Sequence, residues 1–180
     1  MKGVIFTEFL EMVEEKFGLE TVDTIINDSN LESGGAYTSI GIYDFQELKC
    51  LIHNLSKFTK IDPEVLIYSY GVHYFGVLTK KYLSFFNHCK NAFQLITGIE
   101  QYFHVEIKKI YPDTDLPYLE TLENSDSKLV LEYHSKRAFH SFVLGLIEQT
   151  FKYYNEKATV SRKLLNDSGT KALFTIIKNA

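Results

Sequence analysis

Residues 118–137 read Tyr118-Leu119-Glu120-Thr121-Leu122-Glu123-Asn124-Ser125-Asp126-Ser127-Lys128-Leu129-Val130-Leu131-Glu132-Tyr133-His134-Ser135-Lys136-Arg137. The runs 118–123 and 128–133 flank the polar residues 124–127, a pattern that predicts two antiparallel strands joined by a turn. This hairpin decides the fold class, because the pattern of apolar residues along the chain differs before and after it. The rest of the chain can be assigned outward from this point.

The residues before the hairpin are predicted to be helical. Apolar residues recur at three- and four-residue intervals from Ile5 to Phe17, and Gly18 follows as a stop signal. Asp62-Pro63-Glu64 is a strong helix start, since Asp62 can cap the helix and Pro63 suits its first turn. The remaining helices are expected at about 20–27, after Asp44, around 82–86, and at about 91–111, ending before Pro112.

The residues after the hairpin predict one more helix, at about 138–154, and two strands at 158–164 and 173–177. Consecutive helices followed by an antiparallel sheet with an inserted helix argue for an α+β fold without parallel crossovers. No linker or repeat interrupts the chain, and its 180 residues are the length expected of one domain, so residues 1–180 are predicted to form a single domain.

Charge and composition exclude several classes of protein. With 19 Lys and Arg against 23 Asp and Glu, the net charge of -4 argues against binding nucleic acid through bulk positive charge. No apolar run approaches the ~20 residues that span a bilayer. Glu8 comes too early for a signal peptide. Cys50 and Cys89 make neither a disulfide framework nor a zinc motif, so a cytoplasmic protein without membrane contact is predicted.

Familiar catalytic patterns are missing from the sequence. Gly34-Gly35 stands alone rather than within a phosphate-binding loop, and neither HExxH nor GxSxG occurs. The sequence therefore predicts a protein that is not an enzyme.

His104 is the histidine with the most suggestive position. It lies on the predicted 91–111 helix, at the edge of an arc of large apolar residues: Phe93, Leu95, Ile96, Ile99, Phe103, Ile107, Ile110 and Tyr111. An imidazole at the edge of an apolar pocket can be the single proximal ligand of a haem iron. The alternative is a half-buried structural histidine.

A second candidate site follows the hairpin. If the strand continues, Tyr133, Ser135 and Arg137 share one face and offer a phenol, a hydroxyl and a guanidinium. These donors suit two carboxylates on one ligand edge, such as haem propionates. The alternative is a solvated polar face.

Taken together, these residues resemble the haem nitric oxide/oxygen-binding (H-NOX) family, which is related to the haem domain of soluble guanylate cyclase. The resemblance rests on the opening Met1-Lys2-Gly3, on the Tyr-x-Ser-x-Arg motif at 133–137, on His104 before it, and on the prolines of Tyr111-Pro112 and Leu116-Pro117. It covers essentially the whole chain, and it implies a fold with haem between the helical part and the sheet.

The resemblance implies roles for individual residues. His104 would be the proximal ligand of a haem b (iron protoporphyrin IX), and Tyr133, Ser135 and Arg137 would hold its propionates. Three further residues, Ile5, Pro117 and Leu146, would press on the porphyrin and distort it. Three residues would line the distal pocket: Phe9, Phe142 and Tyr74.

The resemblance also implies a gas and an output. Oxygen-binding members carry a distal tyrosine where this chain has Phe142, which cannot donate a hydrogen bond, so selectivity for nitric oxide is expected, with CO binding as well. Nitric oxide would break the iron–histidine bond and free the His104 helix. The signal would pass to a separate protein, a histidine kinase or a cyclic-di-GMP enzyme.

Two points separate this interpretation from its alternatives. No cysteine follows Cys89, so the zinc site of some kinase-linked members is not expected. The rival hypothesis is a haem-free binding module for an apolar carboxylate, with Arg137 as its clamp. A third is an interaction domain that has lost its cofactor. His104 discriminates between the first two, because haem binding depends on it and a carrier of an apolar ligand would not need it.

Overall fold

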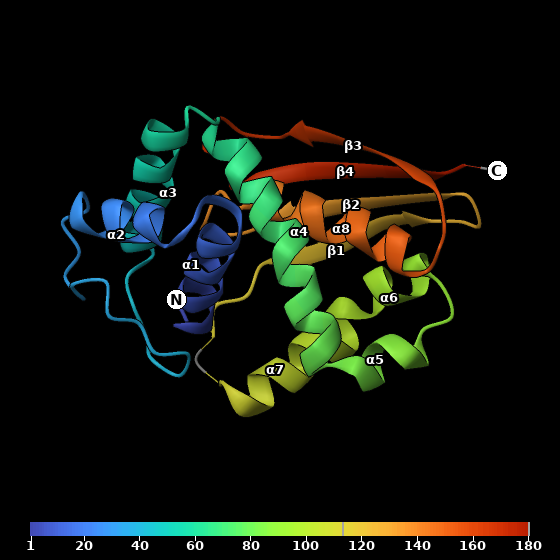
Figure 1. The fold of residues 1–180 in the computed structure, drawn as a ribbon. Helices are drawn as coiled ribbons and strands as arrows, with labels where there is room; N and C mark the ends of the chain where they lie inside the picture. The colour runs from blue at the N-terminus through green and yellow to red at the C-terminus, as the bar shows by residue number, and fades with distance from the viewer. Residues whose placement is uncertain (113, 180) are drawn as a thin grey trace. The chain divides into compact units, whose positions relative to one another are not determined.

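The predicted hairpin is present as strands β1 (Tyr118–Asn124) and β2 (Lys128–His134) in the computed structural model, which describes residues 1–112 and 114–179. Two more strands, β3 (Ala158–Leu164) and β4 (Lys171–Lys178), complete an antiparallel sheet with the strand order β1-β2-β4-β3 (Figure 1). The α+β prediction with an antiparallel sheet is confirmed.

The chain forms two compact units, Met1–Tyr70 and Gly71–Ala180. The sheet and the helix inserted into it, α8 (His140–Tyr153), belong to the second unit. Alternate residues of β2 are buried, as expected when a helix covers one face of a sheet. The core of this unit joins α8 and α6 (Ala92–Gly98) to the sheet, through the buried side chains of Phe93, Ile96, Leu129, Leu131, Tyr133, Val143, Ile147, Phe151, Phe174 and Ile176.

The first unit is helical. It contains α1 (Val4–Phe17), α2 (Leu19–Asn27), α3 (Phe45–Thr59) and the beginning of α4 (Pro63–Lys81). Asp44 caps α3 as predicted, because its side chain accepts a hydrogen bond from the backbone N–H of Gln46. Gly18 separates α1 from α2 with a φ of 87°, which a residue with a side chain rarely adopts. The helices predicted in this part of the sequence are confirmed.

The predicted 91–111 helix is present but not uniform. After α6 comes a π-helical turn, Ile99–Phe103, and then α7 (His104–Ile110). The short α5 (Leu83–His88) precedes this run. The start of α6 is fixed by Glu156, whose carboxylate accepts the backbone N–H of Ala92 at 2.9 Å and binds Nζ of Lys178 on β4 at 2.9 Å.

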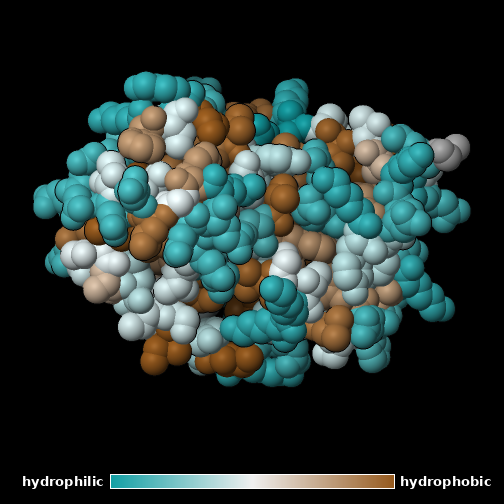
Figure 2. Space-filling model, viewed as in Figure 1, coloured by the Kyte–Doolittle hydropathy of each residue, from teal (hydrophilic) through white to brown (hydrophobic). Residues whose placement is uncertain are grey.

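The surface view shows hydrophobic residues in small groups among hydrophilic ones on the face drawn (Figure 2). Within the described residues, no helix has the length and apolar character needed to cross a bilayer.

Candidate functional site

The π-helical turn sets the direction of His104. In a regular α-helix, Phe103 would lie two turns after Ile96 and share its buried face. The π-helical turn holds one extra residue, with the His104 N–H bonded to the Ile99 carbonyl, so His104 takes that direction instead. His104 is accordingly only 8% exposed, whereas Phe103 is half-buried.

The His104 imidazole is held through one of its two ring nitrogens. Its Nδ1 lies 3.1 Å from Oε1 of Glu100, and the same carboxylate oxygen accepts the Leu119 backbone N–H at 2.8 Å. A carboxylate at this distance favours the tautomer with its proton on Nδ1, which leaves the Nε2 lone pair as the ligand atom. A carboxylate beside the other ring nitrogen is common for histidine ligands to metals.

The Tyr-x-Ser-x-Arg residues occupy a turn rather than a continuing strand. Because β2 ends at His134, the expectation that Tyr133, Ser135 and Arg137 share one strand face is wrong. The Ser135 N–H still bonds to the Thr170 carbonyl at 2.9 Å, but the Ser135 hydroxyl accepts the Arg137 N–H at 3.1 Å. This local hydrogen bond bends the backbone away from the sheet.

Tyr133 supports the turn from inside. Its side chain is 1% exposed, and its hydroxyl donates to the Arg137 carbonyl at 2.8 Å while accepting the Phe139 N–H at 3.2 Å. Burial raises the pKa of Tyr133, which the hydrogen bonds of Ser135 and Phe139 and the charge of Arg137 partly offset. The phenol therefore remains a neutral donor within the fold.

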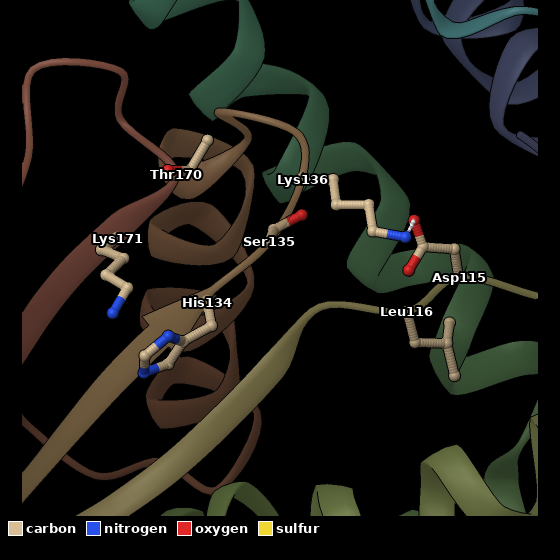
Figure 3. Close-up of a pocket in the computed structure, with 7 residues that line it drawn as sticks. All are labelled: Asp115, Leu116, His134, Ser135, Lys136, Thr170 and Lys171. Atoms are coloured by element: carbon tan, nitrogen blue, oxygen red, sulfur yellow. Dashed lines mark ion pairs between the residues drawn. The ribbon is translucent and has the colours of Figure 1, made fainter.

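Arg137 reaches back to the segment before β1. Its Nη1 donates to the Asp115 carbonyl at 2.9 Å and lies 3.5 Å from Oδ2 of the same residue. Lys136 also approaches that carboxylate, at 3.9 Å, and Figure 3 shows the two side chains meeting. They border an open groove of about 420 Å³, which is lined by Asp115, Leu116, His134, Ser135, Lys136, Thr170 and Lys171.

Apolar side chains predicted for the site also lie in this unit. Phe142 is buried on α8, stacks on Phe139 at 5.0 Å between ring centroids, and lies 5.4 Å from the Tyr74 ring. Leu146, one turn further along α8, is partly buried against the Phe75, Phe86 and Leu95 cluster. Pro117 is half-buried just before β1.

Two predicted residues, Ile5 and Phe9, belong to the first unit, on α1. The Ile5 carbonyl accepts the Tyr70 hydroxyl at 2.6 Å, and the fully buried Phe9 meets the Tyr70 ring edge-on at 5.4 Å. Their roles toward a haem stay predictions from the resemblance.

Sequence reasoning missed two residues of the site. Glu100 stands one helical turn before His104, and that spacing is a usable signal for a side-chain pair on a helix. Asp115 carries no such signal, because its contact with Arg137 joins positions 22 residues apart in the chain.

The family model for haem-NO-binding proteins matches residues 2–162. The chain belongs to this H-NOX family. Among solved structures, the Fe(II) unliganded H-NOX protein of K. algicida is 43% identical, with a TM-score of 0.96 over 100% of this chain and 97% of that one. The IWP-051-bound H-NOX of Shewanella woodyi, in its Fe(II)CO state, is 36% identical, with a TM-score of 0.84 over 99% of this chain and 95% of that one.

A more distant likeness shows the fold alone. The H-NOX protein of S. oneidensis, in its Fe(II)NO state, is 19% identical with a TM-score of 0.89, each chain covered completely. A search of curated proteins found no match. H-NOX domains are haem-binding sensor domains, so this chain has a haem-based gas sensor fold.

The residues present fit a haem rather than a bare metal ion. Among residues 1–112 and 114–179, no group of three or more His, Cys, Asp or Glu side chains is arranged to hold a metal. One buried histidine with a fixed Nδ1 can supply one ligand, and a porphyrin supplies the other nitrogens. Arg137 is the cation suited to a carboxylate on the porphyrin edge.

Proposed function

We propose that this H-NOX domain senses nitric oxide through a ferrous haem b, with His104 as the proximal ligand. The observation that carries the proposal is the His104 environment. The ring is buried and its Nδ1 is engaged by Glu100, so Nε2 is the atom left to coordinate iron. Membership of a haem-binding family supports this assignment.

The chain contributes binding and orientation, and a bound ferrous haem would supply the coordination position for a diatomic gas. Arg137 and Ser135 would bind the propionates, with Tyr133 holding the turn that presents them. Pro117, Leu146 and Ile5 are proposed to press on the porphyrin, as the family resemblance implies. The buried ring of Phe142 excludes water near the gas.

Gas selectivity follows from the side chains near Phe142. A phenyl ring donates no hydrogen bond, so bound O2 lacks polar stabilisation, whereas nitric oxide and CO need none. Tyr74 is the phenol that bears on this selectivity, because its ring lies beside Phe142, with 5.4 Å between ring centroids. We propose that the domain binds nitric oxide and CO and forms no stable O2 complex.

The proposed output is a conformational change read by a separate protein in the cytoplasm, a histidine kinase or a cyclic-di-GMP enzyme. The physical requirement is an element whose two arrangements bind the gas unequally. The helical run containing His104 is that element in this proposal, since it carries the only proposed protein ligand.

The test is an absorption spectrum of the purified protein, reduced without air and then exposed to nitric oxide, CO and air in turn. A haem band that shifts with nitric oxide and CO, without a stable O2 complex, is the expected result. A stable ferrous–O2 complex would contradict the selectivity. A protein that takes up no hemin would refute the haem assignment and favour the binding module for an apolar carboxylate.

A further inference from the structure

We propose that Glu100 is the positioning residue of His104, fixing the imidazole between its own helix and strand β1 and strengthening Nε2 as a ligand. The inference rests on the proposed function, in which His104 ligates the haem iron. Three features of the structure carry it: a shared carboxylate oxygen, its shielding from water, and the π-helical turn.

The first feature is the shared oxygen. Oε1 of Glu100 lies 3.1 Å from His104 Nδ1 and accepts the Leu119 N–H at 2.8 Å. Leu119 belongs to β1 and is 8% exposed, so its N–H is a donor set in the sheet rather than on a mobile loop. The Glu100 carboxylate therefore links the imidazole to strand β1. The position of the carboxylate is itself set by the Leu119 N–H, which lies outside the helix.

Shielding from water makes this contact stronger than an ordinary surface pair. The side chains of His104 and Glu100 are 10% and 27% exposed. Further along the same run, Glu106 and Lys109 pair with side chains that are 60% and 65% exposed. Exposed pairs contribute little because water and salt screen them, whereas a pair that is largely shielded from water is screened much less.

The π-helical turn contains Glu100 and directs His104 to the buried face beside it. Its extra residue turns His104 toward the buried face, and Glu100 lies within the same turn, four positions earlier. π-Helical turns inside α-helices are frequent at functional sites. The irregularity is thus accounted for by the orientation of one imidazole and its carboxylate partner.

The chemical consequence concerns the donor strength of the ring. A carboxylate that accepts the Nδ1–H pushes electron density onto the imidazole, so Nε2 becomes a better donor to a metal. Removing the negative charge weakens that donation, and removing the side chain also frees the ring to rotate. Glu100 is therefore expected to set both the strength and the direction of the histidine ligand.

The experiment compares Glu100→Gln and Glu100→Ala with the control Glu106→Gln, which makes the same chemical change on the exposed part of the run. The Fe(II)–histidine stretching frequency, measured by resonance Raman spectroscopy, should fall in Glu100→Gln and fall further in Glu100→Ala. Hemin should leave Glu100→Ala about 10- to 100-fold faster than the wild type, the usual cost of losing such a partner. Glu106→Gln should match the wild type in both measurements.

A second readout needs no haem signal. Amide hydrogen exchange at Leu119 should accelerate in Glu100→Ala but stay slow in Glu100→Gln, because the amide oxygen still accepts that N–H. If Glu100 only supports the fold, Glu100→Ala should still accelerate exchange at Leu119, but Glu100→Gln should leave the iron–histidine stretching frequency unchanged.

The outcomes distinguish a failure of this inference from a failure of the proposed function on which it rests. If the wild type shows an iron–histidine band that His104→Ala removes, while Glu100→Gln leaves the band and hemin loss unchanged, the positioning role is wrong and the proposed function stands. If the wild type binds no haem, the proposed function is overturned and this inference with it.

Discussion

The helical run around His104 and the turn after β2 solve different problems with different means. In the helix, one side chain performs the task, and a single carboxylate orients it. In the turn, Tyr133, Ser135 and Arg137 bind mostly to backbone atoms, and Arg137 also meets the Asp115 side chain. The comparison teaches that losing His104, the one proposed ligand in the helix, should abolish iron ligation, whereas losing one residue of the turn should weaken haem retention by degrees.

The largest effect is expected from His104→Ala. Without the imidazole, the proposed proximal ligand of the iron is gone, so the native ferrous spectrum should disappear. Adding imidazole should restore a five-coordinate spectrum by occupying the space of the missing ring. A variant that keeps the native ferrous spectrum without imidazole would show that the ligand is another residue.

Inserting one alanine between Phe103 and His104 should come next. The π-helical turn already holds one extra residue, so a second one would rotate His104 by roughly 100° away from the buried face. Haem uptake should then fall sharply while circular dichroism still reports a folded protein. The control is Gln101→Ala, which changes an exposed side chain without changing the length of the run and should bind haem normally. Equal haem uptake by the two variants would contradict the direction that the π-helical turn is said to give His104.

Arg137→Ala should give an intermediate effect. A charge-assisted hydrogen bond contributes about 1.5–3 kcal/mol, which corresponds to hemin loss about 10- to 100-fold faster. Transfer of hemin to an excess of apomyoglobin measures that rate. Lys136→Ala is the matched control, because this neighbouring cation is 85% exposed. If Arg137→Ala lost haem as completely as His104→Ala, the predicted difference between the helix and the turn would be wrong.

The smallest effect is expected from Tyr133→Phe, and it depends on pH. The variant keeps the buried ring but loses the hydroxyl, which should lower the free energy of unfolding by about 1 kcal/mol near neutral pH. Because the folded pKa of Tyr133 is raised, its contribution is complete below the unfolded value of about 10 and declines as pH rises through the folded value.

Urea unfolding at pH 8 and pH 11 tests this pH dependence. The difference between the wild type and Tyr133→Phe should shrink at the higher pH. Tyr118→Phe, on the neighbouring strand and 52% exposed, serves as the control. A difference that grows with pH would mean that the sign of the shift is wrong.

Local patterns predicted most of the elements. The Asp44 cap, the Asp62-Pro63 start and the hairpin around residues 124–127 depend on neighbours in the chain, and all three are present. His104 could be selected because helical spacing places it at the edge of an apolar arc, although its burial depends on the π-helical turn. For the identity of the ligand, however, the resemblance to a family was needed in addition to spacing.

The features that escaped prediction depend on distant or subtle contacts. The end of β2 at His134 is set by the Ser135 hydroxyl turning back to Arg137, a choice between two hydrogen-bond patterns that the residue types alone do not decide. The π-helical turn is a one-residue change of register within an otherwise ordinary apolar periodicity. Asp115 meets Arg137 only because the sheet brings their segments together.

The two carboxylates that hold the 92–110 run restrict how it can move. Glu156 fixes the first N–H of α6 against β4, and Glu100 joins the middle of the run to β1. A rod held at its end and near its centre cannot slide along its axis without breaking both attachments. If nitric oxide frees His104 as proposed, the run is expected to pivot about these two attachments, and α7, which lies beyond both, would be displaced the most.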